Sequence, residues 1–236
     1  MLYDIRNNIE SVRKRIEYAA GMACRRTEDI RIVAITKTVG LEKITEAVNC
    51  GIDTFGENYI QEAREKISNL RFQASNPKIK WHLTGSLQKN KVKYAVELFD
   101  MIETIDRIEL AREIDKKAWN KKIKALIQIN IGAEDAKSGC SEKEAVGLIK
   151  EISHLKNISI EGLMAIPPFF ENPEDARPYF KRLFELSRKI AMEGIDNVSM
   201  KELSMGMSND FEVAIEEGAT MVRIGTAIFG KRRINN

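Results

Sequence analysis

Two charged residues stand in otherwise apolar runs of this sequence, where they could bind an anion or react with a carbonyl group. "RIVAITK" (residues 31–37) reads as a buried strand that ends on Lys37, and "MVRIGTAIFG" (residues 221–230) carries Arg223 inside an apolar run. We expect the two to face each other across one bound anion. A lysine that leaves a buried strand is partly desolvated, which favours a neutral amine, and a free amine in a dry pocket forms a Schiff base with an aldehyde. A surface lysine just beyond the strand is the alternative.

Two further segments predict a site for a phosphate group. In "RIGT", Gly225 and Thr226 stand at the start of a helix, where free backbone N–H groups favour an anion and glycine permits close approach. In "LSMGMSNDFEVAIEEG", Ser208 is expected to cap a second helix, and its hydroxyl and N–H could reach an anion. Ordinary helix capping explains either segment alone, but the two side by side, opposite a lysine, favour a phosphate.

Arg223 lies two residues before the expected phosphate turn, so its guanidinium should point into the same space as Gly225. Because arginine stays charged, a ring nitrogen beside it would remain unprotonated and could only accept a hydrogen bond. A Schiff-base lysine, a phosphate site and a partner for a ring nitrogen together describe pyridoxal 5′-phosphate (PLP). An ion pair between Arg223 and an internal carboxylate such as Glu202 remains the alternative.

The elements that must position these residues are eight short apolar segments, each followed by an amphipathic one. The expected strands lie within residues 31–37, 53–58, 80–85, 101–105, 123–131, 160–166, 201–206 and 220–225. They are apolar on both faces, as parallel strands covered by helices are, and eight such units in 236 residues predict an α/β fold with a single (β/α)₈ TIM barrel. An open doubly wound sheet is the second choice, but no G-x-G-x-x-G turn follows the first strand.

One domain over residues 1–236 is expected, with residues 1–30 as an N-terminal helical segment that packs on the barrel. In such a barrel the functional face is at the C-terminal ends of the strands. The unusual residues fall there, and they include Lys37, Asn58, Gly85, Lys137, Ser208 and Arg223.

The composition excludes several other classes. Hydrophobic residues make up 43% of the chain and the net charge is only +3, which argues against a disordered chain and against binding to nucleic acid. No apolar run approaches membrane length, and only His82 and His154 are available for a histidine-rich metal site. Cys24, Cys50 and Cys140 are odd in number and widely spaced, which indicates a reducing compartment and predicts a cytoplasmic protein.

Six motifs, in this order, closely resemble the pyridoxal phosphate homeostasis proteins (the YggS/PROSC family). They are "AITKT", "FGENYIQE", "WHLTGSLQKNK", "EGLMAI", "LSMGMSNDF" and "VRIGTAIFG", and the match runs from about residue 31 to residue 230. The resemblance implies a single barrel similar to the N-terminal domain of alanine racemase, which binds PLP through a Schiff-base lysine at the position of Lys37.

The same resemblance implies roles for the residues around the cofactor. Arg223 would meet the pyridine nitrogen, and the phosphate would be held by Ser208, Gly225 and Thr226. Pocket neighbours would be Asn58 and Met205, and the cofactor hydroxyl would lie near Lys137.

The resemblance favours a binding protein over an enzyme. A racemase needs a second base on the opposite face of its substrate, and the alanine racemase family supplies it as a tyrosine from a C-terminal domain. This chain stops six residues after Gly230. Tyr59 is expected to be packing at a helix start. We therefore expect a carrier that buffers or delivers PLP, with PLP-dependent apo-enzymes as recipients and no membrane partner. It is expected to be a monomer or weak dimer. A low-efficiency amino-acid racemase is the alternative, and a Schiff-base aldolase whose substrate carries the phosphate is a third, against which Arg223 argues.

Three other polar residues have ordinary interpretations. His82 could face the barrel mouth as a base, but its alternation with Trp81 and Leu83 favours a packed histidine. Glu57 is expected in the first turn of a helix, and Cys140 in a loop near the open face, where incidental oxidation is conceivable.

Overall fold

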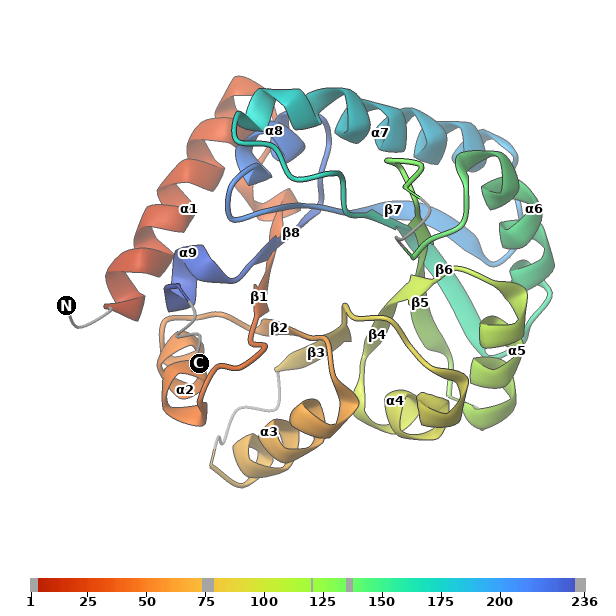
Figure 1. Ribbon diagram of the computed structural model, residues 1–236, viewed down its shortest axis with the longest axis horizontal. Helices are drawn as coiled ribbons and strands as arrows, with labels where there is room; N and C mark the ends of the chain where they lie inside the picture. The colour runs from red at the N-terminus through yellow and green to blue at the C-terminus, as the bar shows by residue number, and fades with distance from the viewer. Residues whose placement is uncertain (1–3, 74–78, 120, 135–137, 232–236) are drawn as a thin grey trace.

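The computed structural model describes residues 4–73, 79–119, 121–134 and 138–231. In these residues the parallel strands pair in chain order from β1 to β8, and β8 returns to pair with β1, so the sheet closes into a barrel. Figure 1 looks down this barrel, with the strands inside and the helices around them. The predicted (β/α)₈ barrel is confirmed. Its strands are β1 (Arg31–Ile35), β2 (Thr54–Glu57), β3 (Lys80–Leu83), β4 (Met101–Ile105), β5 (Ile123–Ile129), β6 (Ile158–Ala165), β7 (Val198–Met207) and β8 (Met221–Ile224).

The helices fall close to the predicted segments. They are α1 (Ile5–Met22), α2 (Leu41–Asn49), α3 (Ile60–Gln73), α4 (Val92–Leu98), α5 (Ile108–Lys117), α6 (Glu142–Ser153), α7 (Arg177–Met192), α8 (Phe211–Glu216) and α9 (Thr226–Phe229). Short 3₁₀ turns precede β1, α4 and α7, namely η1 (Thr27–Asp29), η2 (Lys89–Lys91) and η3 (Pro173–Ala176). No helix of the described residues is both long enough and apolar enough to cross a membrane.

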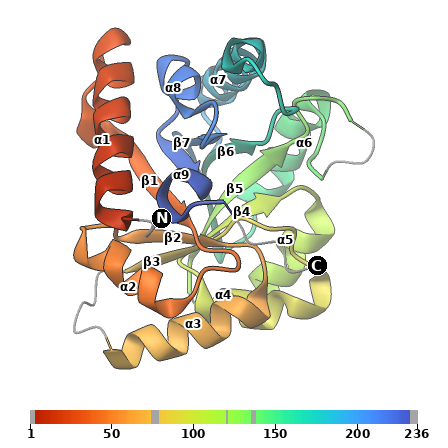
Figure 2. The same cartoon turned by 60° about the vertical axis from the view of Figure 1, so that its left-hand side comes forward.

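The first helix, α1, packs on the outside of the barrel near the point where it closes. Its buried side chains recur at helical spacing (Ile5, Ile9, Val12 and Ile16), and Asp4 caps it by accepting a hydrogen bond from the Asn7 N–H. The helix lies against α8 and α9, which come from the other end of the sequence (Figures 1 and 2). The division of the chain into domains itself stays a prediction.

Alternation along the strands sorts the core into two parts. Val33, Met101, Leu126, Met164 and Met221 form a small separate cluster, as expected of side chains that fill the inside of a barrel. Their neighbours along the strands belong to the large cluster between strands and helices, for example Ala34, Ile102, Leu163 and Val222. Because side chains alternate, Arg223 shares the inner face with Met221.

The strands β6 and β7 approach each other unusually closely at Gly162. A Cβ atom at this position would lie 1.7 Å from the backbone oxygen of Glu202. Only glycine fits there, and the register of the two strands shifts at the same place.

Candidate functional site

The predicted site residues follow four neighbouring strands at the same end of the barrel. Lys37 follows β1, Asn58 follows β2, Ser208 follows β7, and Gly225 with Thr226 follows β8. The barrel order places β7, β8, β1 and β2 next to one another. The closed sheet therefore brings residues from the two ends of the sequence to one mouth.

Lys37 lies two residues beyond β1 and is half-buried. Its Nζ atom stands 4.9 Å from the centre of the Tyr59 ring, which is within the range of a cation–π contact. The prediction that Tyr59 packs at a helix start is wrong, because its side chain is 55% exposed and covers the lysine instead of filling the core.

Ser208 joins the ends of β7 and β8. Its Oγ atom accepts hydrogen bonds from the backbone N–H groups of Gly225 (3.3 Å) and Ala227 (3.2 Å). The expectation that Ser208 caps the next helix is wrong, because that position belongs to Asp210, whose carboxylate instead accepts the Met207 N–H at 2.6 Å.

The space around the first turn of α9 is open. A Cβ atom on Gly225 would meet only atoms of Ile35, at 3.6 Å or more. Thr226, the first residue of α9, is exposed, and Ile35 on the inner face of β1 is half-buried. The two backbone N–H groups here already donate to Ser208 Oγ, so it is the hydrogen of that hydroxyl that can donate to an acceptor oxygen of a bound group.

Arg223 lies inside the barrel and is 4% exposed. One guanidinium nitrogen, Nη1, donates to the Oγ atom of Ser204 at 2.8 Å, and Nη2 donates to the backbone oxygen of Ala165 at 2.9 Å. The alternative partner considered from the sequence, Glu202, forms an ion pair with Arg31 at 3.1 Å instead.

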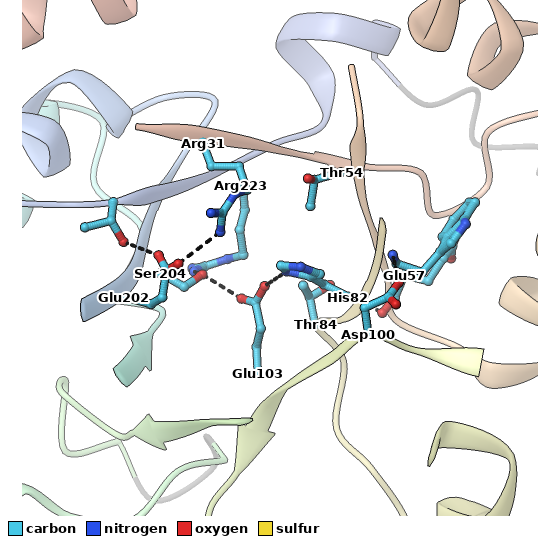
Figure 3. A network of polar contacts seen from close by, with 12 residues as sticks. Arg31, Thr54, Glu57, His82, Thr84, Asp100, Glu103, Glu202, Ser204 and Arg223 are labelled. Carbon is cyan, nitrogen blue, oxygen red and sulfur yellow. Dashed lines mark hydrogen bonds and ion pairs between the residues drawn. The ribbon is translucent and has the colours of Figure 1, made fainter. Parts of the chain in front are cut away.

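A chain of polar contacts continues from Arg223 across the barrel interior (Figure 3). The Ser204 hydroxyl donates to Oε2 of Glu103 at 2.6 Å, and Oε1 of Glu103 lies 2.7 Å from Nδ1 of His82. His82 is indeed buried, but it faces the barrel interior and pairs with a carboxylate. Sequence reasoning missed Glu103 and Ser204, although a glutamate inside the apolar segment "MIETI" was a usable signal.

The charges of this network support one another. Burial lowers the pKa of Arg223, while the charges of Glu103 and Asp210 oppose that change, and an arginine remains protonated. Burial alone would raise the pKa of Glu103, but the hydrogen bond and charge of His82, the charge of Arg223 and the Ser204 hydroxyl together lower it. The barrel interior therefore holds a guanidinium and a carboxylate linked by one hydroxyl.

Glu57 does not stand in the first turn of a helix, as the sequence suggested. It is the last residue of β2, it is fully buried, and it accepts hydrogen bonds from Lys66 Nζ (2.7 Å) and Thr36 Oγ1 (2.6 Å). The expected strand already included this residue, and its carboxylate is buried against Lys66 and Thr36.

The remaining predicted neighbours have different outcomes. Asn58 is half-buried at the mouth, where its Oδ1 atom accepts a hydrogen bond from Thr84 Oγ1 at 3.0 Å. The side chain of Met205 is fully buried in the large cluster on the helix side of β7, so it does not line the mouth as expected. Lys137 lies outside the described residues.

Two cavities flank the barrel at opposite ends. One of about 530 Å³ opens beside the mouth, lined by Asn58, Tyr59 and Gly85 among others. Another of about 740 Å³ lies at the starts of β1 and β8, where Arg31, Glu202 and Thr220 already bond to one another. Lys37, Asn58 and Ser208 follow the strands at the mouth, so we take the mouth as the candidate site despite the larger volume at the other end.

Cys140 is buried beside the end of β5, and this location makes its thiol unreactive. Burial, together with the charges of Glu144 and Asp106, raises its pKa to about 12. At pH 8 roughly one thiol in ten thousand is therefore ionised. In the native protein, iodoacetamide should label the exposed Cys24 and leave Cys140 unmodified, as peptide mass spectrometry can measure. Equal labelling rates at the two positions would contradict this assignment.

Comparison with known proteins identifies the family. The family model of the alanine racemase N-terminal domain matches residues 2–233. A pyridoxal phosphate homeostasis protein of Aquifex aeolicus (strain VF5) is 43% identical over 227 residues, which cover 95% of this chain and 97% of that relative. The protein of the same name from Escherichia coli (strain K12) is 39% identical over 235 residues and covers 97% of each chain. The chain belongs to the pyridoxal phosphate homeostasis protein family.

Solved structures agree with this membership. The structure of PipY of Synechococcus elongatus PCC7942 with PLP bound superposes with a TM-score of 0.83 at 30% identity, over 96% of this chain and all of PipY (100%). Alanine racemase from Corynebacterium glutamicum gives a TM-score of 0.69 at 19% identity, over 98% of this chain and 62% of the racemase. The similarity to the racemase shows a common fold alone. It agrees with the expectation that this family has a barrel similar to the N-terminal domain of alanine racemase.

Proposed function

We propose that this protein binds PLP reversibly, as a Schiff base on Lys37, and so buffers or delivers the cofactor within the cell. The observation that carries the proposal is that three different groups come from the neighbouring strands β7, β8 and β1 of one barrel. An amine comes from the end of β1, and the Ser208 hydroxyl, which accepts from the N–H groups of Gly225 and Ala227, comes from the end of β7. A guanidinium lies inside the barrel on β8. PLP offers an aldehyde, a phosphate and a ring nitrogen to these groups.

The phosphate would lie at the first turn of α9. Ser208 and the backbone N–H groups of Gly225 and Ala227 already converge there, and no side chain of Gly225 obstructs them. Thr226 is exposed beside them and adds a hydroxyl donor. This arrangement is the fit expected for a compact anion with several acceptor oxygens.

Arg223 would face the ring nitrogen. Two of its nitrogens are fixed by Ser204 and Ala165, so its orientation is set before any ligand binds. A permanently charged donor keeps a pyridine nitrogen unprotonated, and this weakens PLP as an electron sink. That property favours storage of the cofactor over turnover of amino acids.

Other predicted neighbours have smaller parts in the proposal. Asn58 stands at the mouth and is proposed as a neighbour of the bound cofactor, and the part suggested for Lys137 stays a prediction. The side chain of Met205 is left out, because it is buried on the helix side of β7. Support for the ligand comes from PipY, whose structure carries bound PLP.

The second candidate is an amino-acid racemase of low efficiency. The observation in its favour is the Tyr59 ring beside Lys37, because a tyrosine near the lysine could act as a second base. A racemisation assay with PLP-loaded protein and L-alanine tests it directly.

The proposed function is tested by an absorption spectrum of the purified protein with added PLP, before and after borohydride reduction. We expect a protein-bound Schiff base band that borohydride removes, and a reduced adduct that peptide mass spectrometry locates on Lys37. Lys37→Ala should lose the band and the adduct, whereas Lys143→Ala, at an exposed position on α6, should retain both. If the wild-type protein takes up no PLP even in excess, the proposal fails.

Three finer points stay predictions. PLP-dependent apo-enzymes are the proposed recipients, and the oligomeric state is proposed to be a monomer or weak dimer. A cytoplasmic location is proposed because the cysteines of the described residues are unpaired.

A further inference from the structure

The turn that carries Lys37 is held by side chains on both sides of the lysine. Before it, the backbone oxygen of Thr36 accepts a hydrogen bond from Lys66 Nζ at 2.5 Å. After it, the backbone N–H of Thr38 donates to Oε1 of Glu62 at 2.6 Å. Both partners come from α3, so one helix fixes the peptide groups that flank the lysine.

The backbone of this turn needs such support. Thr38 adopts a positive φ of 62°, a region that residues other than glycine rarely occupy. Thr36 also accepts a bond from the Val39 N–H at 2.9 Å, which closes a four-residue turn with Lys37 in the middle. A threonine keeps this conformation only where its surroundings hold it in place.

The holding side chains form a buried charged cluster. Lys66 is 7% exposed, and its Nζ lies 2.7 Å from Oε1 of Glu57 and 2.7 Å from Oε1 of Glu62. Glu57 also accepts the Thr36 hydroxyl, while its other oxygen, Oε2, is buried without a partner among the described residues. Burying charged groups costs free energy, and packing α3 on the barrel does not by itself require them. Two hydrogen bonds of this cluster bind the backbone on either side of Lys37.

The same segment also supplies the group that touches the lysine side chain. Tyr59 lies between Glu57 and Glu62 in the sequence, and its ring covers Nζ of Lys37 at 4.9 Å. Residues 57–62 and Lys66 together therefore contact both the backbone beside the lysine and its side chain. This accounts for most of the motif "FGENYIQE", which the cofactor contacts leave unexplained.

We propose that Lys66, Glu57 and Glu62 are positioning residues that hold the Lys37 turn in the geometry required for covalent capture of an aldehyde. In that step Nζ of Lys37 forms a C=N bond to the aldehyde carbon, and the aldehyde oxygen leaves as water. The inference rests on the proposed PLP binding, but it concerns how this chain presents its amine. None of the three side chains needs to touch the cofactor. They act through the two peptide groups next to the lysine, and a small displacement of a reacting amine lowers its rate steeply.

Glu62→Ala is the decisive variant, because Glu62 is partly exposed and its loss leaves Glu57 to neutralise Lys66. We expect the rate of Schiff base formation with PLP, followed by absorbance and by borohydride trapping, to fall about tenfold. Glu62→Gln keeps an acceptor oxygen for the Thr38 N–H and should restore most of the rate. Glu65→Ala makes the same change at an exposed position of α3 and should behave as the wild type. If Glu62→Ala does not fold, Glu62→Asp withdraws the oxygen by one methylene and replaces it in the series.

A second readout needs no cofactor. Competitive labelling with acetic anhydride, read by peptide mass spectrometry, gives the reactivity of Lys37 relative to the exposed Lys143. We expect that ratio to change in Glu62→Ala and to return in Glu62→Gln. Wild-type capture rates and labelling ratios in Glu62→Ala would overturn the inference. The inference would also be overturned if Glu62→Ala loses capture rate, Glu62→Gln does not restore it, and the loss across the variants parallels the fall in their melting temperatures. If the wild type takes up no PLP, the proposed function fails, and the labelling ratio still decides whether the turn is positioned.

Discussion

Replacing Arg223 with leucine is expected to destabilise the fold by about 3–5 kcal/mol, because the buried Glu103 carboxylate loses the positive charge that Arg223 places beside it through Ser204. In the wild type the guanidinium binds Ser204, whose hydroxyl binds Glu103. Without it, Glu103 keeps only Ser204 and His82, and the Ala165 oxygen loses its donor. Urea unfolding at pH 7 measures the loss.

The effect should depend on pH in a defined direction. The pKa of Glu103 is lowered in the folded wild type, so the stability it contributes is present above the unfolded value of about 4.3 and is lost as pH falls through the folded value. In Arg223→Leu the pKa of Glu103 should rise, because the charge of Arg223 no longer opposes the effect of burial. The stability difference between wild type and variant should therefore shrink when unfolding is repeated near pH 4.

A double variant separates this explanation from simple loss of packing. Arg223→Leu with Glu103→Leu removes both charges, and we expect it to be more stable than Arg223→Leu alone. Additive losses that do not change with pH would show that the two charges are not coupled. Because Arg223 also stabilises the fold, reduced PLP binding in its variants counts as support for the proposed role only if the variant protein is shown to be folded.

Gly162→Ala is expected to lower the stability of the fold strongly, although it adds only one methyl group. Its Cβ would lie 1.7 Å from the Glu202 backbone oxygen, and no side-chain rotation relieves a clash with backbone. The strands β6 and β7 would have to separate, which should cost roughly 3 kcal/mol or more. Urea unfolding, or the yield of folded protein, measures this loss.

The matched control makes the same change on a helix. Gly147 lies in α6, and a Cβ atom there would meet no atom within 4 Å. Gly147→Ala should therefore stabilise the protein by about 0.5–1 kcal/mol, because alanine loses less backbone entropy in a helix. A loss below 1 kcal/mol in Gly162→Ala would show that β6 and β7 move apart easily.

The fold was predictable because its signal is local and repeated. Buried parallel strands such as "RIVAI" and "MIETI" are apolar on both faces, and amphipathic helices separate them. Errors were confined to boundaries, yet a boundary decides which way a side chain points. Glu57 was expected in the first turn of a helix and lies instead at the end of β2. Ser208 was expected to cap α8, but the residue at the N-cap position is Asp210.

The candidate site was predictable only in part. Lys37 and Arg223 stood out because each is a charge in an apolar run. Glu103 and Ser204 are distant in sequence, and only the closed barrel brings them into contact. Lys66 lies on an amphipathic helix, where a lysine ordinarily faces water, so nothing local marked it as buried.

The pairing of β1 with β8 has a consequence for the order in which the molecule becomes competent. Arg31 pairs with Met221, so the first strand finds one of its two neighbours only when the last strand has been synthesised. Contacts of such long sequence separation form late in folding. A nascent chain on the ribosome therefore presents Lys37 long before it possesses Arg223 or the turn at Gly225. Unfinished chains would have the Lys37 amine without the rest of the mouth, so the proposed PLP site would exist only in molecules whose translation and barrel closure are complete.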